Sequence, residues 1–527
     1  MLPFSGLLPL AAIAVLVRLV LSAFSSWQHA RKARQMGCRP APIHPGDPFG
    51  ISGLVSTVRY DREKLLPEMV EDRVATMAEI HDRVVSTYRV RLSFQDHLFT
   101  VDPKNIQAVL ATQFKEFGLG SLRIKIFGPL LGHGIFTSDG EEWSHARALL
   151  RPQFTRSQVS DLDLEERHVR NAMQALPVGY DGWTSDTNIQ AIFFRLTIDS
   201  ATEFLFGKSC ESQLAALHSN TGLGTNDFAY CFDRSQQFIA EKVRYEKMYW
   251  LFNREEDRRC QKVVHNFIDH YVESALRSAR GKANNEKASS NDEKQSTPYV
   301  FLEALAASTQ DPLELRAHLV HILLAGRDTT ASLLSWAVLL LARHPEIQQK
   351  LRQVILDEFG TYTQPQKLTF AALKSCQYLQ YCLNETLRLY PVVPFNRREA
   401  LRDTTLPRGG GPDGLSPVFV RKGQNVLYNP HVMHRRKDIW GEDAAEFRPE
   451  RWNARKVGWE YIPFNGGPRI CIGQQFALTE AGYVLVRLLQ RFDSIEDVAP
   501  QRRIRYNLTL TSCPADPVTV RMHEAVN

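Results

Sequence analysis

A long apolar helix is the clearest structural signal in the sequence, and it covers residues 313–344. The segment keeps helical periodicity without a proline until Pro345 ends it. Its second half, from Ala331 to Ala342, is apolar on nearly all sides. A helix without a polar face is typical of the centre of a large domain. We therefore expect a mainly α-helical protein built around this segment.

Composition narrows the class of protein further. The 527 residues carry 64 Lys and Arg against 58 Asp and Glu, a net charge of +6, without the dense basic runs of nucleic-acid-binding proteins. We expect no nucleic-acid partner.

The 8 cysteines are scattered and form no CxxC pair, which argues against a zinc site or a disulfide scaffold. The pattern favours reduced thiols on the cytosolic side.

The first 26 residues predict a membrane anchor. Residues 2–24 contain no acid and only one basic residue, Arg18, and a helix of this length, at ~1.5 Å per residue, spans a ~30 Å hydrocarbon layer. Basic residues follow before the first acid, which places the N-terminus in the lumen and the remainder in the cytosol: Arg31, Lys32, Arg34 and Arg39. The alternative is a cleaved signal peptide with a small-residue site at Ala23 and Ser25.

The remainder divides into a tether and one large domain. Residues 27–50 are basic and rich in proline, which favours an extended spacer. Residues 51–527 follow as a single domain, in which the polar stretch 281–297 reads as a solvated loop, with a linker between two domains as the alternative. Alternating apolar residues over 86–102 predict a small β-hairpin.

A single cysteine in a glycine-rich loop is the most informative chemical feature. Cys471 lies in the run FNGGPRICIG, and a helical segment starts at Gln474. Glycines let backbone N–H groups approach the sulfur, and the helix N-terminus favours a negative charge, so both stabilise a thiolate. A thiolate held in this way is an axial ligand for haem iron, and it helps to cleave an O–O bond. The alternative is a buried cysteine that acts only as a small apolar side chain.

This loop resembles the haem-binding motif FxxGxRxCxG of the cytochrome P450 family. The matching positions are Phe464, Gly467, Arg469, Cys471 and Gly473. The resemblance implies the P450 fold, which is mainly α with small β-sheets and holds haem b between a long central helix and the loop of the cysteine ligand.

Two further segments resemble parts of a structural lock in the same family. Glu385 and Arg388 match ExxR, a spacing that puts an acid and a base on one helix face. Arg451, in the run FRPERW, stands where the family places a third member. The resemblance implies a buried ionic lock behind the haem, whereas the alternative is a solvated surface pair.

In the long helix, the run AGRDTT resembles the family's oxygen-activation motif. Gly326 lets a ligand approach the backbone. We expect Asp328 and Thr329 to act as catalytic residues in a proton relay. The alternative is that Thr329 only hydrogen-bonds to the carbonyl group of Ala325, as helical threonines often do.

The resemblance also implies donors for the two carboxylates of haem. Trp143 and Arg147 match WxxxR and share one helix face. Arg469 and Arg398 stand where the family places its other arginines, and the adjacent Arg397 is the alternative to Arg398.

The chain after the anchor most resembles the fungal branch that hydroxylates alkanes and fatty acids, with departures at Phe395 and Arg397. His321 lies on the helix face of Ala325 and Thr329, either to contact a polar group of the substrate or as an ordinary core residue. The predicted pocket is mostly apolar, which suits an aliphatic chain but also a terpene or a polyketide: residues 119–127, His321, Ile322, Ala325, Thr329, Val392, Val393, Phe395 and Leu508.

Together these features predict a membrane-bound haem-thiolate monooxygenase of the endoplasmic reticulum that inserts one oxygen atom of O2 into a C–H bond. The expected reaction is terminal hydroxylation of a long-chain fatty acid or alkane, with electrons from NADPH through NADPH–cytochrome P450 reductase and with cytochrome b5 as a second candidate donor. The donor is expected to dock near the Cys471 loop, where basic residues gather: Arg435, Arg436, Lys437 and Lys456.

Three other functions stay open on the sequence. The first is a tailoring oxidase for a fungal polyketide or terpene. The others are a peroxide isomerase or dehydratase that needs no reductase, and a haem sensor without catalysis. The acid–alcohol pair and the Cys471 loop favour the monooxygenase.

Overall fold

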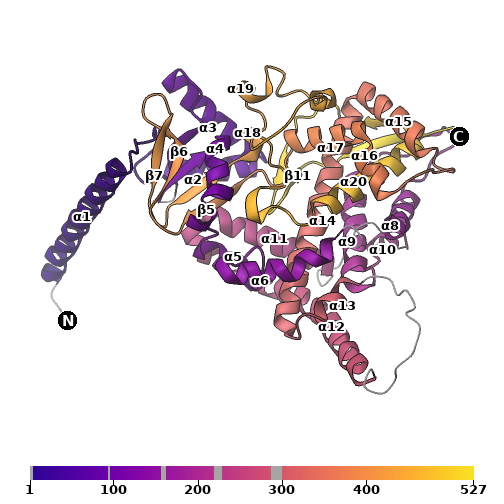
Figure 1. Cartoon of the computed structure of the whole chain (residues 1–527), viewed down its shortest axis with the longest axis horizontal. Coiled ribbons are helices and arrows are strands. Elements are labelled where there is room, and N and C mark those ends of the chain that lie inside the picture. The colour runs from indigo at the N-terminus through magenta and orange to yellow at the C-terminus, as the bar shows by residue number, and fades with distance from the viewer. Residues whose placement is uncertain (1–3, 93–94, 156–161, 219–227, 286–299, 527) are drawn as a thin grey trace.

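Helix α14 (Pro312–Arg343) runs through the middle of the computed structural model, one residue away at each end from the helix predicted over 313–344 (Figure 1). The Asp311 side chain caps its first turn by accepting a hydrogen bond of 2.9 Å from the Leu313 N–H group. Every residue from Ala331 to Leu341 is buried, as the apolar pattern predicts. The structure describes residues 4–92, 95–155, 162–218, 228–285 and 300–526.

Helices account for most of the described chain, so the mainly α class is confirmed. Three of them, α9, α17 and α20, pack against α14 and form the largest core with it. The α-helices are α1 (Phe4–Gln35), α2 (Ile51–Arg62), α3 (Leu66–His81), α4 (Pro103–Gln107), α5 (Ser121–Leu131), α6 (Gly140–Leu150), α8 (Leu162–Gln174), α9 (Ile189–Phe206), α10 (Ser212–His218), α11 (Phe228–Tyr245), α12 (Glu255–Asn285), α13 (Phe301–Ala306), α14, α15 (Pro345–Phe359), α16 (Phe370–Ser375), α17 (Gln377–Leu389), α18 (Pro430–Met433), α19 (Lys437–Trp440) and α20 (Gln474–Arg491).

The strands form small sheets at the edges of the helical body. Sheet orders are β1-β2-β8-β5-β3, β4-β12-β9, β6-β7 and β10-β11. The strands are β1 (Thr87–Leu92), β2 (Gln95–Thr100), β3 (Phe117–Gly118), β4 (Thr187–Asn188), β5 (Asn396–Ala400), β6 (Thr404–Gly410), β7 (Ser416–Val420), β8 (Asn425–Tyr428), β9 (Phe492–Asp497), β10 (Tyr506–Leu508), β11 (Ser512–Pro514) and β12 (Thr519–Glu524).

The hairpin predicted over 86–102 is confirmed. Strands β1 and β2 pair antiparallel, with Tyr88 opposite Phe99 and their ring centroids 4.8 Å apart. Strand β8 continues this sheet on β2, and β5 then pairs with β8. The sheet therefore carries β5, with Arg397 and Arg398, to the wall of the cavity described below.

Aromatic contacts fix α14 against the C-terminal strands. The Trp336 ring is fully buried and stacks on Tyr390 at a centroid distance of 4.3 Å. Its indole N–H group donates to the carbonyl oxygen of Ser512 in β11 at 3.1 Å. This bond satisfies the one polar atom of a buried indole, so the ring contributes its full apolar area to the core.

The N-terminal segment differs from the sequence prediction in one respect. Helix α1 projects away from the rest of the molecule and continues through the basic residues up to Gln35, so the first part of the predicted tether, 27–50, is helical rather than extended (Figure 1). Within the described residues, no helix has both the length and the apolar character that crossing a membrane requires. Much of the span predicted over 2–24 lies outside the residues whose side chains are described.

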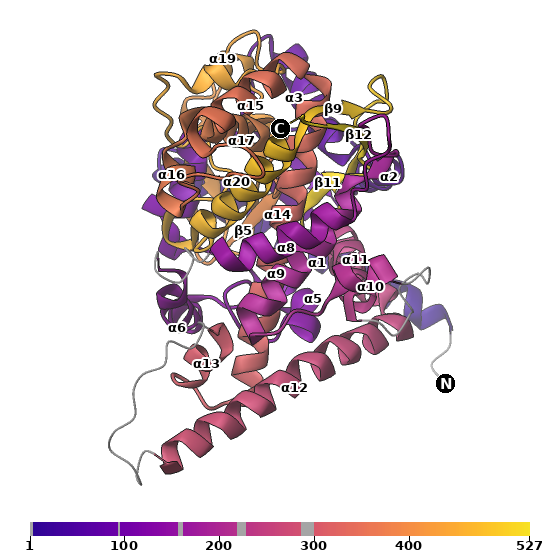
Figure 2. The same ribbon diagram turned by 90° about the vertical axis from the view of Figure 1, so that its right-hand side faces the viewer.

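The boundary of the predicted solvated loop, 281–297, also differs. Helix α12 extends to Asn285 and crosses one side of the molecule beside α13 (Figure 2). Residues 286–299 lie outside the described part of the chain.

Candidate active site

An elongated cavity of about 590 Å³ lies between the middle of α14 and the loop that carries Cys471. Helix α14 contributes Ala325, Gly326 and Thr329 to its wall, and the loop contributes Phe464 and Cys471. The structure therefore brings together two motifs that are far apart in the sequence, in the wall of one cavity.

The Cys471 loop is a tight turn that requires a glycine. The Cys471 N–H group donates to the carbonyl oxygen of Phe464 at 3.0 Å, and the Ile470 N–H group donates to that of Gly467 at 3.1 Å. Gly467 has a φ of 67°, in the left-handed region, and a Cβ atom there would collide with the carbonyl oxygen of Leu110. The loop can therefore lie this close to the chain at Leu110 only with glycine at 467.

The thiol of Cys471 is placed to bind a ligand in the cavity. Cys471 is exposed, and because it lines the cavity, we infer that its thiol faces that space; the other described cysteines are buried, apart from the half-buried Cys210. Because this cavity lies inside the protein and shields the thiol from bulk water, the pKa of Cys471 is raised, whereas the Gly473 N–H group and the charge of Arg147 lower it. These two groups favour the thiolate that the sequence predicts at this position.

Four arginines gather in the cavity wall beside this loop. Arg147 donates to the carbonyl oxygen of Ile470 at 3.0 Å, and Arg469 pairs with Asp139 at 2.7 Å and lies over the ring of Trp143. Arg398 is buried and bonds to Asn396 and to the carbonyl group of Arg397, whereas Arg397, which also lines the cavity, pairs with Glu246. The fourth member is Arg123 of α5, which the sequence predicts only as part of the pocket stretch 119–127 and not as a donor to haem.

The arginine cluster has too few anions of its own. Within the described chain, Arg123, Arg147 and Arg398 have no carboxylate at ion-pair distance. Burial and the charges of neighbouring arginines lower the pKa of Arg123 to about 9, while burial above all lowers that of Arg469 to about 10. An apolar cavity with a free thiol and several unpaired cations fits a large flat group with two carboxylates, as haem has. The residues present therefore fit the cofactor that the sequence predicts.

The relay predicted at Asp328 and Thr329 is only partly assembled. Thr329 lines the cavity, and its hydroxyl donates to the carbonyl oxygen of Ala325 at 2.6 Å. Asp328 does not line the cavity; its carboxylate accepts from Arg327 at 2.9 Å, and Arg327 also pairs with Asp233. The side chains diverge because adjacent residues of a helix do not face each other. Burial raises the pKa of Asp328 to about 6.

His321 is a predicted pocket residue that the structure places elsewhere. It does not line the cavity but lies beneath residues 131–136, where its Nδ1 atom accepts from the Phe136 N–H group at 3.2 Å and its ring stacks on Phe136. Burial lowers its pKa to about 3. It is therefore a core histidine, the alternative that the sequence left open. Residues 120–122 and 124–126 of the predicted stretch 119–127 do not line the cavity either. Several other predicted positions do line it: Leu119, Arg123, Phe127, Ile322, Ala325, Thr329, Val392, Val393, Phe395 and Leu508.

The predicted lock residues form one buried cluster. Glu385 accepts two hydrogen bonds from Arg388, at 2.8 and 2.9 Å, and one from Arg451 at 3.1 Å. Arg388 also donates to backbone carbonyl groups of His434, Ala444 and Glu446. The side chains of Glu385 and Arg388 are 0% exposed, so this is no solvated surface pair.

A second buried carboxyl group, Glu480, lies close to the motif in α14. Its carboxylate accepts from the Ser200 hydroxyl at 2.6 Å, and burial raises its pKa to about 7. Thr330, which lines the cavity, is also close enough to affect this pKa. The sequence predicts neither Glu480 nor a cofactor-binding role for Arg123, because each lies on a helix with other charged residues and outside any motif.

Comparison with known proteins identifies the family. Residues 65–518 match the cytochrome P450 family model. The chain is 49% identical to the cytochrome P450 monooxygenase g430 of a Fusarium species, over 98% of this chain and 90% of the relative. It is 42% identical to the cytochrome P450 monooxygenase alt2 of Alternaria solani, over 97% and 96% of the two chains, and 45% identical to cytochrome P450 52A10 of Candida maltosa, over 83% and 84%. The chain therefore belongs to the cytochrome P450 family and is a P450 monooxygenase.

Proposed function

We propose that this monooxygenase hydroxylates a long aliphatic chain at or near its end. The observation that carries this proposal is the lining of the cavity, which stays mostly apolar from the Cys471 loop to helices α2 and α3. Ala325, Val392 and Phe395 lie toward the loop, and Leu54 and Val70 line the other end. A long apolar space that a flexible chain fills suits a fatty acid or an alkane.

The residues that would hold the cofactor follow from the site. Cys471 would bind the iron of haem b, with Phe464, Gly467 and Gly473 shaping its loop. Trp143, Arg147, Arg398 and Arg469 would hold the haem carboxylates, and Arg123 joins them in this proposal. Haem bound in this way supplies the oxygen-activating chemistry of the family. Glu385, Arg388 and Arg451 hold the segments behind the loop in place.

Asp328 and Thr329 have separate parts in the proposed proton supply. The Thr329 hydroxyl, in the cavity wall, would hold a proton at Oγ1 beside the reacting carbon. Asp328, whose pKa of about 6 lets it gain and lose a proton near neutral pH, would be the source. Its carboxyl group has to leave Arg327 to reach the cavity side of α14, and Arg327 keeps Asp233 as a partner when it does.

Members of the P450 family generally use a reductase as the partner. For this chain we propose NADPH–cytochrome P450 reductase, with cytochrome b5 as a second donor, docked near the Cys471 loop. Of the basic residues predicted there, Arg436 and Lys437 pair with Asp438 and Glu442, while Lys456 is exposed. Lys437 is exposed as well, whereas Arg435 and Arg436 are half-buried, so we propose that Lys437 and Lys456 contact the electron donor.

We also propose that α1 attaches the protein to the endoplasmic reticulum membrane, with the catalytic domain in the cytosol. Exposed apolar side chains on the described part of α1 support this: Ile13, Leu16, Val17, Val20, Leu21 and Phe24. Such side chains are stable in contact with lipid but not with water.

Substrate-dependent NADPH consumption tests the proposed reaction. Membranes that contain this protein and a fungal reductase are incubated with NADPH and dodecanoic acid, hexadecanoic acid, hexadecane or a cyclic terpene. The proposal predicts faster NADPH consumption and an alcohol product with the linear compounds. Consumption that responds only to the terpene would favour a tailoring oxidase. Consumption that responds to none of them, with a normal carbon monoxide spectrum, would contradict the aliphatic substrate.

A further inference from the structure

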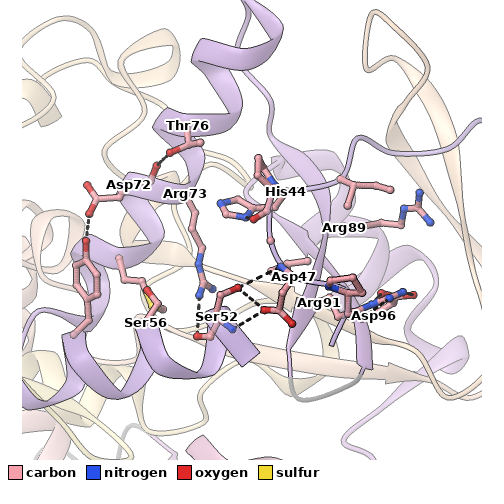
Figure 3. Close-up of a pocket in the computed structure, with 18 of the residues that line it drawn as sticks. His44, Asp47, Ser52, Ser56, Asp72, Arg73, Thr76, Arg89, Arg91 and Asp96 are labelled. Carbon is pink, nitrogen blue, oxygen red and sulfur yellow. Dashed lines mark hydrogen bonds and ion pairs between the residues drawn. The ribbon is translucent and has the colours of Figure 1, made fainter. Parts of the chain in front are cut away.

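Arg73 of α3 lies where the inner cavity meets a polar recess on the surface. Residues 43–48, helices α2 and α3 and strand β1 form this recess (Figure 3). Arg73, Met69 and Val90 line both the recess and the inner cavity. Arg73 is therefore a cation at the mouth of an apolar cavity.

The guanidinium group of Arg73 has unused hydrogen-bonding capacity. Its Nη2 atom donates to the carbonyl oxygen of Gly53 at 3.5 Å, which is the long limit of a hydrogen bond (Figure 3). No carboxylate lies at ion-pair distance from it in the described part of the chain. Burial lowers the pKa of Arg73, and only the hydroxyl groups of Tyr88 and Tyr60 raise it. A partly buried cation of this kind gains from an anionic ligand.

The carboxylates of the recess are already engaged with other groups. Asp47 accepts from the Ser52 hydroxyl and from backbone N–H groups at the start of α2. Asp72 accepts from the Tyr60 hydroxyl at 2.6 Å, and Asp96 pairs with Arg91 at 2.7 Å. None of the three is therefore a free counter-ion for Arg73.

The other cations that line this end of the cavity do have partners. Arg244 pairs with Asp61 at 2.9 Å, and Arg397 pairs with Glu246 at 3.1 Å. The remaining arginines of the wall belong to the cluster proposed for the haem carboxylates. Arg73 thus differs from Arg244 and Arg397 by its lack of an anion, and it differs from the arginines of the cluster by its position at the mouth.

Apolar side chains surround the inner side of Arg73. Leu54, Leu66, Met69 and Val70 line the cavity next to it, and from there the apolar lining continues to the Cys471 loop. An extended chain that enters the cavity with a polar head at Arg73 would therefore place its tail in an apolar environment near the loop.

We propose that Arg73 binds the carboxylate of a long-chain fatty acid and so selects acids over alkanes. This inference rests on the proposed function, which it narrows to anionic aliphatic substrates. A guanidinium group offers parallel N–H donors that match the two oxygens of a carboxylate. With the head fixed at the mouth, the end of the chain is the part presented near Thr329.

The test compares ligand affinities of the purified holoenzyme and an Arg73→Gln variant. Hexadecanoic acid, its methyl ester and hexadecane are titrated while the haem absorbance is followed. We expect the wild-type protein to bind the acid more tightly than the ester, and Arg73→Gln to weaken binding of the acid by roughly tenfold or more, since a charged hydrogen bond is lost. Binding of the ester and of hexadecane should stay within about twofold.

Two further variants control the result. Arg59→Gln removes the same charge from the recess at a position that does not line the inner cavity, so it should leave all affinities unchanged. Arg73→Lys keeps the charge but not the paired donors, so it should retain part of the preference for the acid. If Arg73→Gln does not fold, Arg73→Lys becomes the test. An unchanged preference of Arg73→Lys for the acid over the ester would then overturn the proposal.

The outcomes separate this inference from the proposed function. Equal affinity of the wild-type protein for acid and ester, or an unchanged affinity for the acid in Arg73→Gln, overturns the role of Arg73 and leaves aliphatic hydroxylation standing. If none of the three ligands binds to the wild-type protein, the aliphatic function itself is contradicted, and the role of Arg73 falls with it.

Discussion

The Thr329 hydroxyl donates a hydrogen bond of 2.6 Å to the carbonyl oxygen of Ala325, one turn earlier in α14, and both residues line the cavity. Ser335 makes an equivalent bond of 2.6 Å to Ala331 in the same helix, but it is fully buried and does not line the cavity. The two hydroxyl groups thus share one local geometry and differ in what they face. A comparison of variants at Thr329 and Ser335 therefore separates a catalytic role of the hydroxyl group from a structural one.

We predict that Thr329→Ala diverts electrons into hydrogen peroxide. Without the Oγ1 proton in the cavity wall, a larger share of the NADPH consumed should appear as peroxide and a smaller share as hydroxylated product. Both products are measured against NADPH consumption. Ser335→Ala, which removes the equivalent bond outside the cavity, should keep the wild-type ratio. An unchanged ratio in Thr329→Ala would remove Thr329 from the proton supply.

Loss of Glu385 should destabilise the protein strongly. Glu385→Ala leaves Arg388 and Arg451 buried without their shared carboxylate, at a cost of about 3–5 kcal/mol. Chemical denaturation followed by circular dichroism measures this loss. Glu442→Gln, which breaks an exposed pair with Lys437, should change the stability by no more than about 0.5 kcal/mol. Similar losses in the two variants would show that the lock is not a stabilising element.

Gly467→Ala should prevent the Cys471 loop from adopting its conformation. The new Cβ atom would collide with the carbonyl oxygen of Leu110, and alanine is also strained at a φ of 67°. The carbon monoxide spectrum per milligram of protein reports how much haem-thiolate enzyme forms, and it should fall severely. Gly128→Ala is the matched control, because a Cβ atom there meets no atom within 4 Å. A normal spectrum for Gly467→Ala would contradict the loop geometry.

Glu480 should make the stability of the protein depend on pH. Because burial raises its pKa from 4.5 to about 7, the folded chain holds a proton that the unfolded chain has lost between these values. Its contribution is therefore full below pH 4.5 and is lost as the pH rises through 7, by on the order of 3 kcal/mol. Asp328, with a pKa raised to about 6, acts in the same direction.

The measurement is the free energy of unfolding in urea at several pH values between 5 and 8. Glu480→Gln should show a smaller decrease of stability with pH than the wild-type protein, because a glutamine cannot ionise. Glu442→Gln, on the surface, should show the wild-type dependence. Parallel curves for Glu480→Gln and the wild-type protein would mean that Glu480 does not titrate in this range.

The sequence predicts those parts of the site whose geometry is set by residues close to each other in the chain. The spacing of Glu385 and Arg388 puts them on one helix face, and the glycines around Cys471 define its loop. The burial of α14 follows from its apolar sequence alone, since a helix without a polar face has to lie in the interior of the protein.

The parts that escaped prediction depend on contacts between distant segments. Asp328 is bonded to Arg327, which pairs with Asp233 of α11, and nothing near Asp328 in the sequence signals the contact with α11. His321 faces residues 131–136 rather than the cavity. Arg73 gains its position only when α3 packs beside α2 and β1. Helical periodicity tells which residues share a face but not which neighbour that face meets.

The position of the hydroxyl group on hexadecanoic acid is the most direct measure of how this enzyme holds its substrate. The purified enzyme is reconstituted with a fungal reductase and NADPH, and the product is analysed by mass spectrometry. A carboxylate held at Arg73 and an aliphatic tail near Thr329 and Cys471 predict hydroxylation at the terminal carbon or the one next to it. Hydroxylation spread along the chain or concentrated near the carboxyl group would contradict this arrangement.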